Sequence, residues 1–187
     1  IPAMPCFAAM MLSVFVFVRR RLPPTAALLA FALPMTLPVV SFSIQSRPYA
    51  LWLAASGWAL VCWQSAVREG GGTERRRILS LWGLYASLTA AILAHYVGAL
   101  IFLPLVAGEL WRSRKTGRDL PVWLTFAAAA AAIAVYVPFL KASAIYRVHP
   151  WHGVVPHDLE ETYLLGISAV ALGIIILSVA AHMLGRE

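Results

Sequence analysis

The sequence predicts an all-α fold, a polytopic transmembrane helical bundle. Apolar residues make up 61% of the chain and charged residues only 12%, with a mean hydropathy of +0.78. In soluble domains about a quarter of the residues are charged. The apolar residues also form long blocks rather than stripes, which would leave a folded soluble domain without a polar exterior. These features favour membrane helices over the rival interpretation, a soluble helical bundle.

The placement of the basic residues also predicts a membrane protein, because they lie in short clusters between the apolar blocks. Twelve of the fifteen Lys and Arg residues fall in four clusters: Arg19 to Arg21, Arg68 with Arg75 to Arg77, Arg112 to Arg118, and Arg186. Cytoplasmic loops of membrane proteins carry such an excess of positive charge. We therefore assign the net charge of +7 to membrane topology and exclude nucleic acid as a partner.

If all four clusters are cytoplasmic, each segment between them crosses the membrane an even number of times. The segment 78–111 would be roughly 51 Å long as one helix, against a hydrocarbon core of about 30 Å, so it predicts two crossings. The predicted spans are about 1–18, 25–42, 49–67, 78–94, 97–111, 121–140 and 162–184. The N-terminus then lies outside and the C-terminus in the cytoplasm.

The chain is predicted to form one membrane-embedded module, residues 1–187, and to be a fragment. It opens on Ile1-Pro2-Ala3 without a charged region before its first apolar block, so we expect no signal peptide. Cys6 and Cys62 lie in apolar blocks without zinc-site spacing and are expected to be inert.

The first outer turn is expected around residues 43–48, within Gln45-Ser46-Arg47-Pro48-Tyr49-Ala50-Leu51. Pro48 suits the first position of a helix that returns into the membrane. The positive end of that helix and the forked guanidinium of Arg47 would together suit a phosphate. Alternatively, Arg47 extends to lipid headgroups and has no substrate.

The second outer turn is expected at His95-Tyr96-Val97-Gly98, where His95 ends one span and Gly98 eases the turn into the next. A histidine here could bind a phosphate, a metal or an acceptor hydroxyl, or could shuttle a proton. It could also simply be hydrogen-bonded to a neighbour.

A third outer loop, about 141–161, is rich in groups that can bind metals. Three histidines and three carboxylates fall within residues 149–161: His149, His152, His157, Asp158, Glu160 and Glu161. Their spacing matches no zinc pattern, so we predict an exposed polar loop and no metal site.

Two motifs give the chain a family resemblance. Gln45-Ser46-Arg47-Pro48-Tyr49-Ala50-Leu51 and the later Ala94-His95-Tyr96-Val97-Gly98-Ala99-Leu100 resemble elements of bacterial GT-C class membrane glycosyltransferases, the family 39-like and RgtA/B/C/D-like enzymes. Those enzymes carry an Arg-x-Tyr-Ala-Leu element at an outer helix end and a Thr-His-Tyr-like element at the next outer turn. Here Leu93-Ala94 replaces the threonine, and the resemblance covers about residues 34–106.

The resemblance implies an inverting transfer of a sugar from a polyprenyl-phosphate donor to a lipid, glycan or protein acceptor, at the outer face of the bacterial cytoplasmic membrane. It implies that the two outer turns are neighbours around a common cavity, with Arg47, Tyr49, His95 and Tyr96 binding substrate. The family's general base is an acidic residue upstream of the matched region, so no catalytic residue is assigned here, and the fragment alone is expected to be inactive. Cofactors remain unassigned.

Two other classes of function stay open. A secondary transporter would show inverted repeats around a midplane site, and a non-catalytic membrane scaffold would not need Arg47 and His95. We take the spans to contain no carboxylate, which argues against a proton-coupled transporter.

Overall fold

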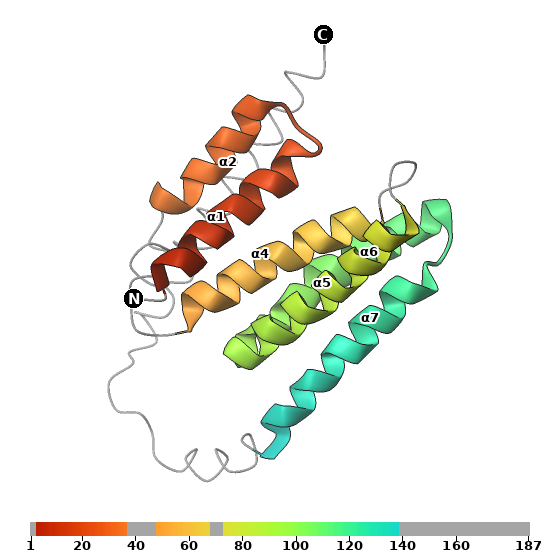
Figure 1. Ribbon diagram of the computed structural model, residues 1–187. Helices are drawn as coiled ribbons and strands as arrows, with labels where there is room; N and C mark the ends of the chain where they lie inside the picture. Colours follow the sequence, from red (N-terminus) through yellow and green to blue (C-terminus); the bar gives the residue numbers. More distant parts are fainter. Residues whose placement is uncertain (1–2, 37–47, 68–72, 139–187) are drawn as a thin grey trace, which may run out of the picture.

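The computed structural model describes residues 3–36, 48–67 and 73–138 (Figure 1), and within them every element is helical, which confirms the all-α prediction. The α-helices are α1 (Ala3–Arg19), α2 (Pro24–Thr36), α4 (Tyr49–Ala66), α5 (Glu74–Ala94), α6 (Phe102–Thr116) and α7 (Leu120–Ala130). Two 3-10 helices, η1 (Tyr96–Ile101) and η2 (Ala131–Val135), follow α5 and α7. The predicted seventh span, 162–184, lies outside the described residues.

The helices form a row in the order α2, α1, α4, α5 and α7 (Figure 1). Helix α6 is not part of this row. It returns from the end of α5 and packs against both α4 and α5. Leu105 of α6 shares the main hydrophobic core with Leu84 and Leu88 of α5, and all three side chains are fully buried. This core also includes Val122 and Phe126, so α7 closes its far side.

Small residues let α1 and α4 approach closely. A Cβ atom at Gly57 would lie 2.0 Å from the Ser13 hydroxyl oxygen, so α4 presents bare backbone to α1 at this point. The Ser13 hydroxyl is itself buried and donates to the carbonyl of Met10 at 2.6 Å. Ala54 packs beside it with Met10 and Met11. Such close contacts replace the large side chains that drive packing in water-soluble cores.

Two helices depart clearly from the bounds predicted for the spans. The predicted span 97–111 contains most of η1 and the start of α6, but α6 continues to Thr116. We predicted that the fourth span begins at residue 78, but α5 begins at Glu74. Thr73 is the N-cap, and its side chain accepts a hydrogen bond from the Arg76 N–H at 3.4 Å. The first turn of the helix consists of charged residues, so a prediction from hydropathy does not include it in the span.

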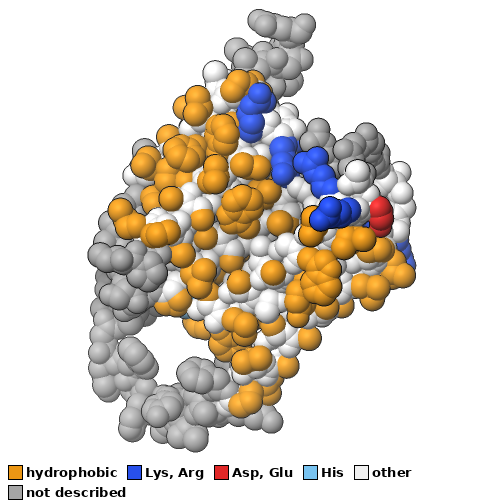
Figure 2. All heavy atoms as spheres, viewed as in Figure 1, with side chains coloured by type: hydrophobic (Ala, Val, Ile, Leu, Met, Phe, Trp, Pro, Cys, Tyr) orange, Lys and Arg blue, Asp and Glu red, His pale blue; other side chains and the backbone are white. Residues whose placement is uncertain are grey.

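Two helical segments of the described chain, Glu74–Ala94 and Leu120–Pro138, are long and apolar enough to cross a membrane. Only 22% and 17% of their most apolar windows are buried, whereas the core helix of a soluble protein is mostly buried. Hydrophobic side chains accordingly cover much of the face in Figure 2. Helices α1 and α2 are apolar but shorter.

The basic clusters within the described residues lie together at one end of the bundle (Figure 2). Arg20, after α1, donates to the Val61 carbonyl at 2.8 Å and to the Ser65 hydroxyl at 2.6 Å, near the end of α4. Arg77, at the start of α5, forms an ion pair with Asp119, just before α7. The end of α1 therefore lies beside the end of α4, and the start of α5 lies beside the start of α7.

Candidate functional site

The opposite end of the bundle contains the break after α5, and His95 organises it. His95 has an extended backbone (φ −159°, ψ 136°), and its N–H donates to the Ala91 carbonyl at 3.2 Å. Its Nδ1 accepts a hydrogen bond from the Val97 N–H at 3.2 Å, and its carbonyl accepts one from the Gly98 N–H at 2.7 Å. The predicted turn at His95 is confirmed, although a 3-10 helix follows it rather than an immediate α-helix.

The cap fixes which atom of the imidazole is available for chemistry. An Nδ1 that accepts a hydrogen bond carries no proton, so the neutral ring carries its proton on Nε2. The Nε2–H is then the remaining donor of the ring, suited to a phosphate oxygen or another anionic acceptor.

Gly98 allows the chain to fold back tightly against α5. A Cβ atom there would lie 2.1 Å from the carbonyl oxygen of Ala91 and 2.5 Å from its carbonyl carbon. No side chain fits between these backbones, so glycine is required by close approach rather than by an unusual φ angle. This is the role predicted for Gly98.

The first residue of α4 meets the break after α5 at this end. The ring of Tyr49, the first residue of α4, lies 5.3 Å from the His95 ring, and Tyr96 stacks on His95 at 4.5 Å. These separations are typical of interacting aromatic rings. The expected proximity of Tyr49, His95 and Tyr96 is thus confirmed, while Arg47 lies outside the described residues. Pro48 is the N-cap of α4 rather than its first helical residue, one position from the prediction.

Two further residues belong to this end, although the sequence did not assign them to the site. Trp52 lies one turn into α4, with its ring 6.1 Å from that of His95. Its indole N–H is buried and has no hydrogen-bond acceptor among the residues that the structure describes. Tyr136, just beyond η2, donates through its hydroxyl to the carbonyls of Ile92 (2.8 Å) and Leu93 (3.0 Å), which closes the last turn of α5. Tyr136 lies in an apolar segment of the sequence, and no pattern there predicts that its hydroxyl binds the end of α5.

An apolar hollow of about 500 Å³ lies between α1, α4 and α5. Pro5 and Leu51 line it at the end that carries Tyr49, and Trp58 and Ala86 line it farther along. It has the size of a small-molecule site, for which about 300–1,000 Å³ is typical.

A buried carboxylate corrects one expectation. We took the spans to contain no acidic residue, which is wrong: Glu109 lies within the predicted span 97–111 and is 0% exposed. Its oxygens accept hydrogen bonds from the Trp63 indole (3.0 Å), the Arg112 Nε (3.0 Å) and the Ser113 hydroxyl (3.3 Å). Arg112 also lies 3.6 Å from Asp119. Since both oxygens are occupied, Glu109 is placed to hold α4 and α6 together and not to relay protons.

No metal-binding group of three or more His, Cys, Asp or Glu side chains is present in residues 3–36, 48–67 and 73–138. The outer loop of predicted polar residues, 141–161, lies outside this part of the chain. Comparisons with models of known protein families, with curated proteins and with solved structures find no match for the chain.

Proposed function

We propose that the chain is a multi-pass protein of the bacterial cytoplasmic membrane, with seven spans, its basic end in the cytoplasm and the Tyr49–His95 end outside. The exposed apolar surface of α5 and α7 supports this placement. The gathering of the described Lys and Arg residues at one end supports the orientation. Trp82 and Trp111, both about 65% exposed, lie toward that end, where indole side chains favour the membrane interface.

We further propose that the Tyr49–His95 end binds the phosphate of a polyprenyl-phosphate sugar and that the protein transfers the sugar to a lipid, glycan or protein acceptor. The observation that carries this proposal is the ring contact between Tyr49 and His95. It brings together two sequence motifs that resemble separate elements of one glycosyltransferase family.

The chemistry of this end suits a phosphate leaving group. Donors that are already in position stabilise charge as it develops on the departing oxygen, and such stabilisation is usually a large part of catalysis. Donors of this kind would be the His95 Nε2–H and the N-terminus of α4, and the Trp52 indole N–H, which is buried beside His95, would join them if the site opens to a ligand. Arg47, beside Pro48 in the sequence, would add a forked guanidinium.

The apolar hollow between α1, α4 and α5 supports a donor carried on a lipid, because it begins at the same end as Tyr49. No residue of the chain is proposed as the general base. The acceptor hydroxyl must lose a proton during the transfer, and a carboxylate is the group expected for that step.

The experiment is an assay of the complete protein in membrane vesicles with a panel of radiolabelled polyprenyl-phosphate sugars. Transfer of label from one of these donors to extractable lipid, glycan or protein is the expected result. Absence of transfer from every donor, combined with uptake of a solute by the same vesicles, would favour a transporter instead.

A further inference from the structure

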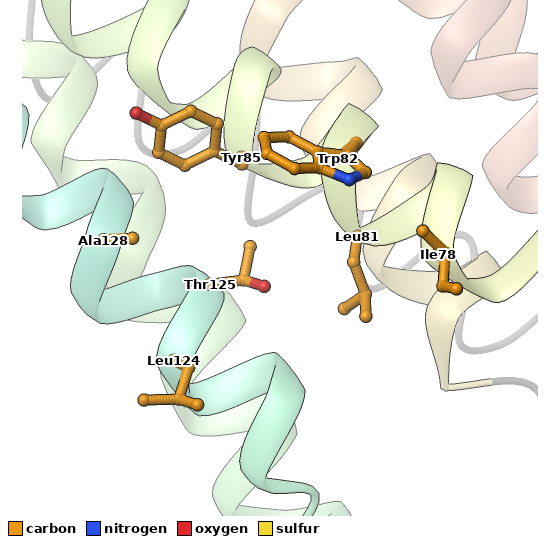
Figure 3. A pocket seen from close by; sticks show the side chains of 7 residues that line it. All are labelled: Ile78, Leu81, Trp82, Tyr85, Leu124, Thr125 and Ala128. Atoms are coloured by element: carbon orange, nitrogen blue, oxygen red, sulfur yellow. The ribbon is translucent and has the colours of Figure 1, made fainter.

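A second apolar groove, of about 410 Å³, lies between α5 and α7 (Figure 3). Ile78, Leu81, Trp82 and Tyr85 line it from α5, and Leu124, Thr125 and Ala128 line it from α7. Several of these side chains are left open: Ile78 is 45% exposed, Leu124 59% and Trp82 65%. The groove is distinct from the hollow between α1, α4 and α5.

The surface of the groove is predominantly apolar. Thr125 supplies a hydroxyl, but this hydroxyl donates to the Pro121 carbonyl of its own helix at 2.8 Å. Trp82 and Tyr85 present ring surfaces that meet edge to face, with centroids 6.1 Å apart (Figure 3). Such a surface matches a hydrocarbon chain, which needs burial and no hydrogen bonds.

The end of the groove nearest the basic end is strongly cationic. Helices α5 and α7 both begin there, so both direct the positive ends of their dipoles toward it. Ile78 and Leu124 each lie four residues from the first residue of their helix, about 6 Å along the axis. Arg75 precedes Ile78 by three residues and therefore shares its face, and exposed Arg118 lies just before α7.

The acidic groups at this end do not cancel that charge. Ten Lys and Arg residues of the described chain gather here with three acidic residues, Glu74, Glu109 and Asp119. Glu109 is paired with Arg112, and Asp119 with Arg77. Glu74 precedes Ile78 by four residues and therefore also shares its face, but a single carboxylate there leaves a positive excess at this end.

We propose that this groove binds one anionic phospholipid, with an acyl chain along Trp82 and Leu124 and the headgroup phosphate at Arg75, Arg118 and the two helix N-termini. The inference rests on the membrane insertion proposed above and is independent of sugar transfer. Basic pockets beside apolar helix surfaces on the cytoplasmic side are suited to anionic headgroups.

The test uses the full chain in nanodiscs that contain equal amounts of phosphatidylglycerol and phosphatidylcholine, followed by native mass spectrometry of retained lipid. We expect one phosphatidylglycerol retained in preference to phosphatidylcholine. Arg75→Gln should reduce the enrichment about fivefold, as expected for one basic group near a lipid phosphate. Arg76→Gln is the matched control, because Arg76 precedes Leu79 and Ser80, which do not line the groove.

A second pair of variants tests the groove itself. Ala128→Leu narrows the groove at an exposed position and should reduce retention, whereas Ala127→Leu adds the same volume at an exposed position outside it. Equal retention of the two lipids, or equal effects of the paired variants, would overturn the inference. Flotation with phosphatidylcholine vesicles distinguishes the lipid site from membrane insertion. A chain that floats but shows no preference for phosphatidylglycerol refutes only the lipid site. A chain that does not float refutes membrane insertion as well.

Discussion

The imidazole of His95 lies 5.3 Å from the phenol ring of Tyr49, although the first caps the end of α5 and the second begins α4. The contact therefore joins the start of α4 to the end of α5. It also separates two roles of a single ring: Nδ1 holds the turn by accepting from the Val97 N–H, and Nε2 is left for a ligand.

Replacement of Gly98 by alanine should destabilise the chain. The new methyl group would meet the Ala91 backbone, which cannot move without opening the turn, so we expect a loss of about 1–3 kcal/mol in the free energy of unfolding. Gly83→Ala is the control, because its methyl group would meet only the Cys62 thiol, 2.8 Å away, which can rotate. Denaturant titrations in detergent, followed by circular dichroism, measure both. Equal stability of Gly98→Ala and wild type would contradict the observed turn.

Removal of the Glu109 carboxylate should lower the free energy of unfolding by more than Gly98→Ala does. In Glu109→Ala the guanidinium of Arg112 loses its buried partner, and so does the indole of Trp63, which typically costs about 3–5 kcal/mol. Glu74→Ala, at an exposed first-turn position, should cost less than about 1 kcal/mol. The same unfolding titrations apply, and similar losses in the two variants would show that Glu109 is not buried as described.

Topology is tested by single cysteines in a chain that lacks Cys6 and Cys62. Cysteines at Gly71 and Thr116 should react with a membrane-impermeant maleimide only after the cytoplasmic side is opened. Cysteines at His95 and His152 should react in intact cells. Reaction of Gly71 and His152 from the same side would refute the proposed arrangement of hairpins.

The sequence predicted those features that depend on local composition. Apolar blocks between Arg clusters located the helices, and His95 with Gly98 located the break after α5, because a turn needs particular residues at particular positions. The start of α5 was missed by four residues because its polar first turn, capped by Thr73, resembles a loop in hydropathy.

Features that depend on contacts between helices were not predictable in the same way. The burial of Glu109 requires Trp63 from another helix and Arg112 one turn away, and only the packing of α6 on α4 brings them together. Tyr136 closes α5 from the far side of the bundle. By contrast, the proximity of Tyr49 to His95 was expected from the family resemblance and the shared membrane face.

Arg47→Lys should keep the positive charge but lose the forked geometry that fits a phosphate. A hydrogen bond to a charged group is worth about 1.5–3 kcal/mol, which corresponds to roughly 10- to 150-fold in rate if it forms in the transition state. We expect that loss in the transfer assay with the complete protein, together with normal amounts of folded protein in the membrane. Wild-type turnover would instead indicate that Arg47 only reaches lipid headgroups, as lysine does equally well.

The most direct test of the account is the rate of sugar transfer by His95→Asn in the complete protein, measured beside its stability. The Asn carbonyl oxygen can take the place of Nδ1 and accept from the Val97 N–H, but the side chain does not reach the position of Nε2. His95→Gln is the complementary control, since it reaches that position but does not reproduce the cap. The account predicts that His95→Asn keeps the wild-type unfolding midpoint and loses about tenfold or more in transfer rate, as for one lost hydrogen bond to a charged group. A wild-type transfer rate in a stable His95→Asn variant would contradict it, because His95 would then only cap a helix.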